Sequence, residues 1–159
     1  MPTPFTPFAP FAPFAPKHIL VATDFEDASR HAEDLAVALA AEFGARITLL
    51  HVWTAPPPVY AGAFAWPIEG VEAAARAALE RRLASLRQRH ARSEAMLAGG
   101  HPADVILATA AADHADLIVM GTHGRRGLPH IVLGSTAERV LRQSNIPVLT
   151  TGATATTPT

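Results

Sequence analysis

The sequence predicts an α/β fold in which five parallel strands form one open sheet with helices on both faces. Short apolar runs of strand length alternate with longer segments of helical periodicity, and no tight-turn signal joins two strands directly. The chain has 159 residues, of which 49% are hydrophobic, enough for one sizeable core. We therefore expect a single domain rather than two smaller units.

The first two predicted strands flank a helix. Residues 17–23 contain the apolar run Ile-Leu-Val-Ala and end at Asp24, and residues 46–52 contain a similar run. Between them, residues 27–43 have helical periodicity, and Gly44 is a typical C-terminal stop. The predicted apolar side of this helix consists of Ala28, His31, Ala32, Leu35, Ala36, Leu39 and Phe43.

The middle of the chain predicts one loop, two helices and a short strand. Residues 54–67 include three consecutive prolines and are expected to form a long loop, either a lid, an interface or a mobile linker. Residues 69–92 predict an amphipathic helix, 94–98 a weak short strand, and 102–113 a helix that starts at Pro102. Glutamates interleave with the arginines of the first helix, so we interpret those arginines as a solvated face and not as a nucleic-acid site.

The last third of the chain combines a strand, a glycine-rich loop and a helix. Residues 117–120 predict a strand buried on both faces, and Gly121 ends it. A helix begins near Gly134 and Ser135, and residues 147–150 predict the last strand. Free backbone N–H groups and the positive end of the helix dipole point to one place in such an arrangement. The expected ligand is therefore a phosphate group.

The glycine spacing of this loop is similar to that of a known protein family. Gly121 is followed by two residues, Gly124, nine residues and then Gly134-Ser135. The P-loop would need Gly-Lys-Ser/Thr, and the dinucleotide fingerprint would need three glycines within six residues. The spacing instead resembles the nucleotide-binding motif of the universal stress protein family, in the subgroup that binds ATP. The resemblance covers about residues 17–151 and implies a Rossmann-like sheet in the order 3-2-1-4-5, with a ligand crevice at the carboxyl ends of the first and fourth strands.

The resemblance also implies roles for individual residues. It places Asp24 near the ribose and the main chain of Val52 against adenine, while Arg125 lies outside the match but within chain reach of the phosphates. The implied ligand is ATP with a divalent ion, Mg²⁺ or Mn²⁺, and the loop at 54–67 would be a flap beside it. The expected binding residues are Ala22, Thr23, Asp24, Val52, Met120, Gly121, Gly124, Arg125, Gly134, Ser135 and Thr136.

Several of these residues have simpler interpretations. Asp24 can be only a turn residue that caps a helix, and Gly121 can merely end a strand. Ser135 lacks the Gly-x-Ser-x-Gly elbow of a nucleophilic serine, so no catalytic residue is assigned. No metal site is predicted among the side chains, because the histidines are not spaced as metal ligands are. The histidines considered are His18, His31, His51, His90, His101 and His114.

Two classes of function remain. The first is an ATP-binding regulatory module of the stress response with at most slow ATP hydrolysis, because no general base is evident. The second is a stress-associated interaction protein that acts through its dimer surface, with an empty pocket or one that binds AMP or a cyclic nucleotide. Family members generally dimerise, many through the last strand, and residues 147–150 are short and apolar, as such an edge requires. A homodimer is therefore predicted, and a further protein partner stays open.

Composition limits the other partners. A formal net charge of −1 argues against nucleic acid and anionic membranes, and the lack of cysteine excludes disulfides. No apolar run approaches the roughly 20 residues of a membrane span, and the N-terminus lacks a signal-peptide pattern, so a cytoplasmic location is expected. The predicted organisation is a Phe-Ala-Pro leader at 1–16, one domain at 17–151 and a polar tail at 152–159. The leader is either disordered or docks through its phenylalanine stripe.

Overall fold

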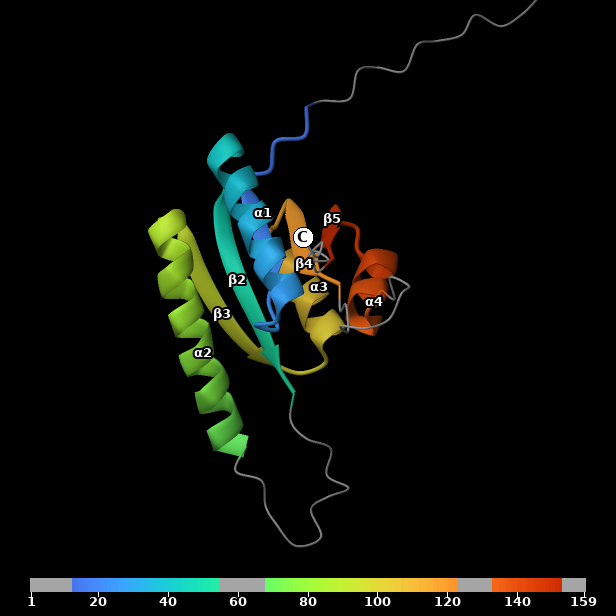
Figure 1. The fold of residues 1–159 in the computed structure, drawn as a ribbon. Helices are drawn as coiled ribbons and strands as arrows, with labels where there is room; N and C mark the ends of the chain where they lie inside the picture. Colours follow the sequence, from blue (N-terminus) through green and yellow to red (C-terminus); the bar gives the residue numbers. More distant parts are fainter. Residues whose placement is uncertain (1–12, 55–67, 123–132, 153–159) are drawn as a thin grey trace, which may run out of the picture.

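Five parallel strands form one sheet in the order β3-β2-β1-β4-β5, which confirms the predicted fold class and strand order (Figure 1). The computed structural model describes residues 13–54, 68–122 and 133–152. Most of the leader, the loop at 54–67, the glycine-rich loop and most of the tail therefore lie outside the described residues. The strands are β1 (His18–Ala22), β2 (Arg46–Trp53), β3 (Ser93–Gly99), β4 (Leu117–Gly121) and β5 (Val148–Thr151).

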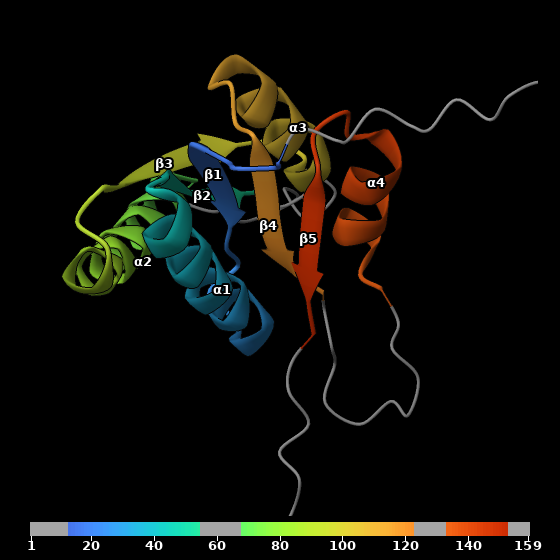
Figure 2. The same ribbon diagram turned by 90° about the horizontal axis from the view of Figure 1, so that it is seen from above.

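Four helices cover the sheet, two on each face (Figure 2). The helices α1 and α2 pack against one face, and α3 and α4 pack against the other. This arrangement follows from right-handed connections between parallel strands, which place the crossover helices over the sheet. The bounds are α1 (Asp27–Phe43), α2 (Ile68–Arg89), α3 (Pro102–Ala112) and α4 (Ser135–Gln143).

The central strands are apolar on both faces because helices cover both. In β1, Ile19 and Val21 join the core under α1 and α2, whereas Leu20 joins the core under α3 and α4. All three side chains have no exposed surface. The alternation of side chains along a strand therefore divides one apolar run between two cores.

The helix α1 buries a narrower stripe than its sequence pattern predicts. Its fully buried apolar positions are the small residues Ala32, Ala36 and Ala40, while Leu35 and Leu39 are only partly buried. The carboxylate residue Glu33 is also buried, at 1% exposure. The predicted inward positions Ala32 and Ala36 are therefore confirmed, whereas the predicted leucines are less buried than expected. The small side chains bring this helix close to the sheet.

The end of α2 and the length of β3 also differ from the prediction. The helix ends at Arg89 and not at Arg92, because the chain turns there and Ser93 Oγ donates to the His90 carbonyl oxygen at 2.7 Å. The strand β3 is seven residues long and pairs with β2 from Ser93 to Gly99. It is therefore a full edge strand and not a weak short one.

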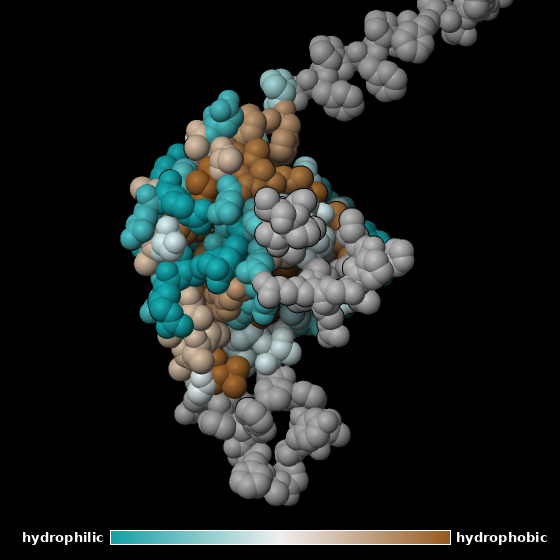
Figure 3. All heavy atoms as spheres, viewed as in Figure 1, coloured by the Kyte–Doolittle hydropathy of each residue, from teal (hydrophilic) through white to brown (hydrophobic). Residues whose placement is uncertain are grey.

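The outer surface of α1 and α2 is largely polar. Hydrophilic residues gather over these helices in the view of Figure 3. On α2, the Arg76 guanidinium pairs with the exposed Glu72 at 2.7 Å, while Leu79 and Leu86 face the core. Within the described residues, no helix has the length and apolar character needed to span a membrane.

Candidate functional site

A pocket opens where the strands β1, β2 and β4 end. Because the strands are parallel, their carboxyl ends share one edge of the sheet, and β1 pairs with β4 so that Ala22 lies beside Met120. The order of the sheet reverses at these two strands, which is where open α/β sheets bind ligands. The cavity volume is about 110 Å³, and its walls are Ala22, Thr23, Asp24, Ser29, Leu50, His51, Val52, Pro102, Ile106, Met120, Gly121, Thr136 and Ala137.

Seven of the eleven residues expected at the site line this pocket. They come from three strand ends and from the first turn of α4. Two others, Gly134 and Ser135, lie directly before Thr136 but are not among the lining residues. Gly124 and Arg125 lie outside the described residues. The seven are Ala22, Thr23, Asp24, Val52, Met120, Gly121 and Thr136.

The turn after β1 is held by its own side chains. The Thr23 hydroxyl donates to Glu33 Oε1 at 3.2 Å and accepts the Phe25 N–H at 3.1 Å, so it is used within the protein. His51 Nδ1 lies 2.7 Å from the Thr23 carbonyl oxygen. A carbonyl oxygen can only accept, so Nδ1 carries the proton. The rings of His51 and Phe25 also pack, with centroids 4.2 Å apart.

Asp24 has the turn role that the sequence left open as its simpler interpretation. One carboxylate oxygen, Oδ1, accepts the Glu26 N–H at 3.0 Å, just before α1 begins. Asp24 is also exposed and lines the pocket. It is the only charged side chain in the described pocket wall, which contains no lysine or arginine.

Gly121 has a packing reason as well as a place in the pocket. A Cβ atom at this position would lie 2.6 Å from the Ala28 carbonyl carbon and 2.7 Å from the Ser29 nitrogen. Both atoms belong to the backbone at the start of α1. Only glycine therefore lets α1 approach the end of β4 this closely, and the residue does more than end a strand.

The backbone at the start of α4 has the arrangement of a helix N-terminus that can bind an anion. Gly134 is the N-cap, with φ −61° and ψ 146°, and no side-chain hydrogen bond caps the helix. Thr136 and Ala137 of the first turn line the pocket. The first N–H groups of a helix have no partner within it, so these donors and the helix dipole are available at the pocket.

Sequence reasoning missed six of the lining residues. Leu50 and Ile106 have the pattern of core residues, and His51 lies in a strand without any ligand spacing. Ser29 lies inside a helix and is not on its predicted apolar side. Only Pro102, at the start of α3, had a signal, since a proline at the first position of a helix marks an end that faces the edge of the sheet.

Comparison with known proteins places the chain in a family. Residues 16–151 match the family model described as the universal stress protein family. A universal stress protein of Thermus aquaticus is 35% identical over 142 residues, which cover 84% of this chain and 96% of that protein. Both matches span most of the chain, and the family model includes every described strand and helix.

Solved structures agree with this assignment. A protein of the universal stress protein family from Burkholderia pseudomallei has a TM-score of 0.66 and 30% identity, with 84% of this chain and 94% of that chain covered. A universal stress protein in complex with cAMP has a TM-score of 0.65 and 26% identity, with 88% and 99% covered. The chain therefore belongs to the universal stress protein family.

Proposed function

We propose that this protein binds an adenine nucleotide in the pocket at the ends of β1, β2 and β4, with ATP and Mg²⁺ or Mn²⁺ as its working ligand. It would act as a regulatory module of the stress response and not as a dedicated enzyme. The observation that carries the proposal is that seven of the residues expected from the resemblance line one pocket. The related structure with cAMP supports a purine nucleotide as the ligand class.

The walls of the pocket suit a nucleoside. Ligand pockets are mostly apolar, with a few polar groups that fix orientation. Here Leu50, Val52, Ile106 and Met120 provide apolar surface for a base, and the main chain at Val52 would read its edge. The Asp24 carboxylate is the polar group suited to accept hydrogen bonds from ribose hydroxyls.

The phosphate groups would lie at the N-terminus of α4. The helix has no side-chain cap, so its first N–H groups can donate to phosphate oxygens. The described walls carry no cation to balance the phosphate charge, which supports roles for a divalent ion and for Arg125. Gly124, which has no charge, would contribute its backbone N–H. Mg²⁺ prefers oxygen ligands, and Thr136 and Asp24 offer a hydroxyl and a carboxylate beside the phosphates' own oxygens.

The titratable groups of the described walls support binding without fast turnover. These groups are Asp24 and His51, and each already holds the turn after β1 through one atom. A general base must reach the attacking water and be free to take its proton. Each group is engaged in the turn, and the sequence shows no evident general base, so we propose that hydrolysis is slow at most.

The first experiment is the nucleotide content of the purified protein, released by denaturation and identified by chromatography and mass. Bound ATP or ADP near one per chain, or saturable binding of ATP with Mg²⁺, is the expected result. A protein that carries no nucleotide and binds neither ATP, AMP nor cAMP would overturn the proposal. It would favour the alternative of an interaction protein that acts through its dimer surface.

The cAMP complex of a relative favours one specific alternative ligand. If cAMP or AMP binds more tightly than ATP in parallel calorimetric titrations, the pocket serves a monophosphate. Tighter ATP binding that depends on Mg²⁺ would favour the main proposal. The comparison uses one protein preparation, so differences in folding do not enter.

Replacing Gly134 with valine is expected to weaken ATP binding at least tenfold. The backbone at Gly134 has ordinary angles, so valine is tolerated there, but its side chain would fill the space where phosphates approach the α4 N-terminus. Calorimetry measures the affinity, and circular dichroism checks the fold. The control is Gly70→Val, an exposed glycine of α2 that does not line the pocket. Unchanged affinity in Gly134→Val would mean that this loop is not the phosphate site.

We also propose a homodimer formed through β5, the edge strand next to β4. Light scattering at micromolar concentration should give twice the chain mass of 16.8 kDa. Leu149 on β5 is 37% exposed, and Leu149→Asp should shift the protein to a monomer because a charge would be buried in the interface. The control is Met96→Asp on the opposite edge strand β3, where Met96 is 38% exposed. A monomeric parent protein would contradict the proposal.

A further inference from the structure

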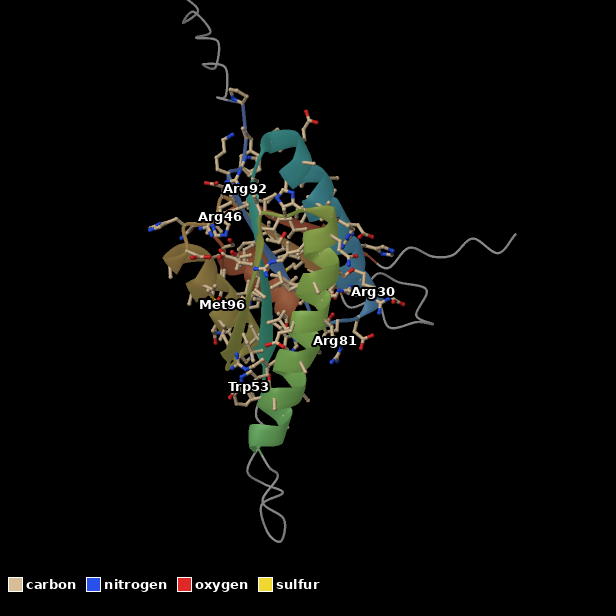
Figure 4. All side chains as sticks on the ribbon, turned by 90° about the vertical axis from the view of Figure 1, so that its left-hand side faces the viewer. Arg30, Arg46, Trp53, Arg81, Arg92 and Met96 are labelled. Carbon is tan, nitrogen blue, oxygen red and sulfur yellow. The ribbon has the colours of Figure 1, made fainter. Side chains whose placement is uncertain are left out.

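A second cluster of polar side chains lies at the other end of the sheet. His18 begins β1, Glu94 belongs to β3, and Asp113 follows α3. One potential ligand atom from each lies within 4.8 Å of the other two. Arg46 and Trp53, the first and last residues of β2, mark the two ends of the sheet in Figure 4, and the cluster lies at the Arg46 end. It is therefore separate from the nucleotide pocket.

The backbone fixes the orientation of the His18 ring. His18 Nδ1 lies 3.0 Å from the Asp113 carbonyl oxygen, so Nδ1 must donate and carries a proton. In a neutral ring, Nε2 then has a free lone pair. Histidines that bind metals usually donate their other ring N–H to a carbonyl or carboxylate in this way. The side chain is 5% exposed, so the ring is held in place by its surroundings.

Three oxygen atoms lie near the Nε2 atom, and the Thr48 hydroxyl oxygen is the one that carries a proton. Thr48 Oγ1 lies 2.8 Å from Nε2, 3.0 Å from Glu94 Oε1 and 3.3 Å from Asp113 Oδ2. One hydroxyl proton can serve only one of three acceptors. Arg46 Nη1 donates to Glu94 Oε1 from outside the cluster, so Thr48 has one acceptor less to serve. A cation between His18 Nε2 and Asp113 Oδ2 would satisfy the lone pairs that the hydroxyl proton leaves.

The distances suit a small four-coordinate ion. Zinc–nitrogen and zinc–oxygen bonds of about 2.0 Å in a tetrahedron place neighbouring ligand atoms about 3.3 Å apart. The 3.6 Å from His18 Nε2 to Asp113 Oδ2 is close to this value, and the ligand atoms of all three residues lie within 4.8 Å of one another. Thr48 Oγ1 lies 2.8 to 3.3 Å from them, which suits a fourth ligand. A movement of the exposed Glu94 side chain toward the other two would complete the site.

Arg46 is the group that a metal would displace. Its Nη1 lies 2.5 Å from Glu94 Oε1 and 3.9 Å from Asp113 Oδ2, so it supplies positive charge to the two carboxylates from outside. It does not reach the His18 lone pair in any contact of the structure. The Arg46 side chain is 38% exposed and can turn into solvent.

We propose that His18 Nε2, Glu94 and Asp113 bind a divalent transition metal, with Zn²⁺ as the best match, and with Thr48 Oγ1 or water as the fourth ligand. One imidazole and two carboxylates are ordinary zinc ligands, whereas Mg²⁺ requires an octahedron of oxygen atoms. The ion would tie β1 and β3 to the end of α3. Since it binds the folded chain, it would also raise thermal stability.

The test is a titration of the metal-free full-length protein with Zn²⁺ alone, in the absence of nucleotide. We expect one saturable site by calorimetry, a higher Tm with Zn²⁺, and little response to Mg²⁺. Glu94→Gln and Asp113→Asn should each weaken zinc binding at least tenfold and abolish the Tm rise. Both replacements keep the size of the side chain, so the fold is retained.

Two further variants make the result specific. Asp104→Asn, on the exposed surface of α3 and paired with Arg139, is the matched control and should leave zinc binding unchanged. Arg46→Gln should strengthen binding, because it removes the competing cation. The absence of saturable binding would mean that the cluster holds no metal, and equal binding by Glu94→Gln and Asp113→Asn would place zinc elsewhere. Either result overturns the proposal and leaves the nucleotide proposal untouched.

Discussion

Replacing Arg82 with methionine is expected to lower the free energy of unfolding by about 3 kcal/mol, because it removes the main partner of a buried carboxylate. Among the described residues, the carboxylate then keeps only the Thr23 hydroxyl at 3.2 Å and the Arg89 guanidinium at 3.9 Å. Arg82 Nε lies 2.9 and 2.8 Å from the two oxygens of Glu33, which is 1% exposed. Urea denaturation at pH 7 measures the loss. The matched control is Arg76→Met on the same helix, whose partner Glu72 is exposed, where a change of about 1 kcal/mol or less is expected.

The loss of stability in Arg82→Met should depend on pH in a defined direction. Burial raises the pKa of Glu33 above its ordinary value of 4.5, and Arg82 opposes this effect. A raised pKa in the folded state means that the contribution of Glu33 to stability is full below about pH 4.5 and declines as pH rises through the folded pKa. Without Arg82 the pKa rises further, so the gap between variant and parent protein should widen from pH 4 to pH 7.

A second variant separates the charge from the packing. In the Arg82→Met background, Glu33→Gln removes the buried charge and should recover part of the lost stability at pH 7. The same pair of variants should differ little at pH 4, where the lone carboxylate is protonated. A loss in Arg82→Met that is equal at both pH values would show that packing of the arginine, and not the buried charge, is responsible.

The ion pair also shows what the sequence pattern of α1 could not predict. The pattern placed Ala32 and Ala36 on the inner side, but it counts only apolar side chains and so left out Glu33. Glu33 is nevertheless inside, because Arg82 arrives from α2, 49 residues further along the chain. No local pattern contains that information. The strands were predicted well for the opposite reason: apolar runs covered on both faces depend little on which helix covers them.

The site contains residues that the strand pattern predicts and residues that depend on contacts between distant parts of the chain. Ala22, Met120 and Gly121 were placed together because the carboxyl ends of parallel strands share an edge. His51 could not be placed, because its role depends on the carbonyl oxygen of Thr23, in the turn after β1. The cluster of His18 and Asp113 was missed likewise, since 95 residues separate the two and spacing along the chain gave no ligand pattern.

Gly121→Ala is expected to cost about 3 kcal/mol of stability, at the upper end of the usual effect of overpacking. The added Cβ would lie 2.6 Å from the Ala28 carbonyl carbon and 2.8 Å from its oxygen. These are backbone atoms, so no side chain can turn away and α1 itself must move. Urea denaturation measures the effect. The control is Gly152→Ala, where the nearest atom to the new Cβ is Thr122 Oγ1 at an ordinary 3.8 Å.

This result also decides how a binding defect at Gly121 should be interpreted. If α1 moves away from β4, the turn at Asp24 and the wall formed by Ser29 move with it, since both adjoin the start of α1. Nucleotide affinity would then fall because the pocket is distorted, and not because the glycine lost a contact to phosphate. Gly134 is the N-cap of α4 and has ordinary backbone angles, so Gly134→Val tests the phosphate site more directly. If Gly121→Ala proves as stable as Gly152→Ala, the close approach of α1 to β4 does not exist in solution, and the geometry of the pocket wall must be revised.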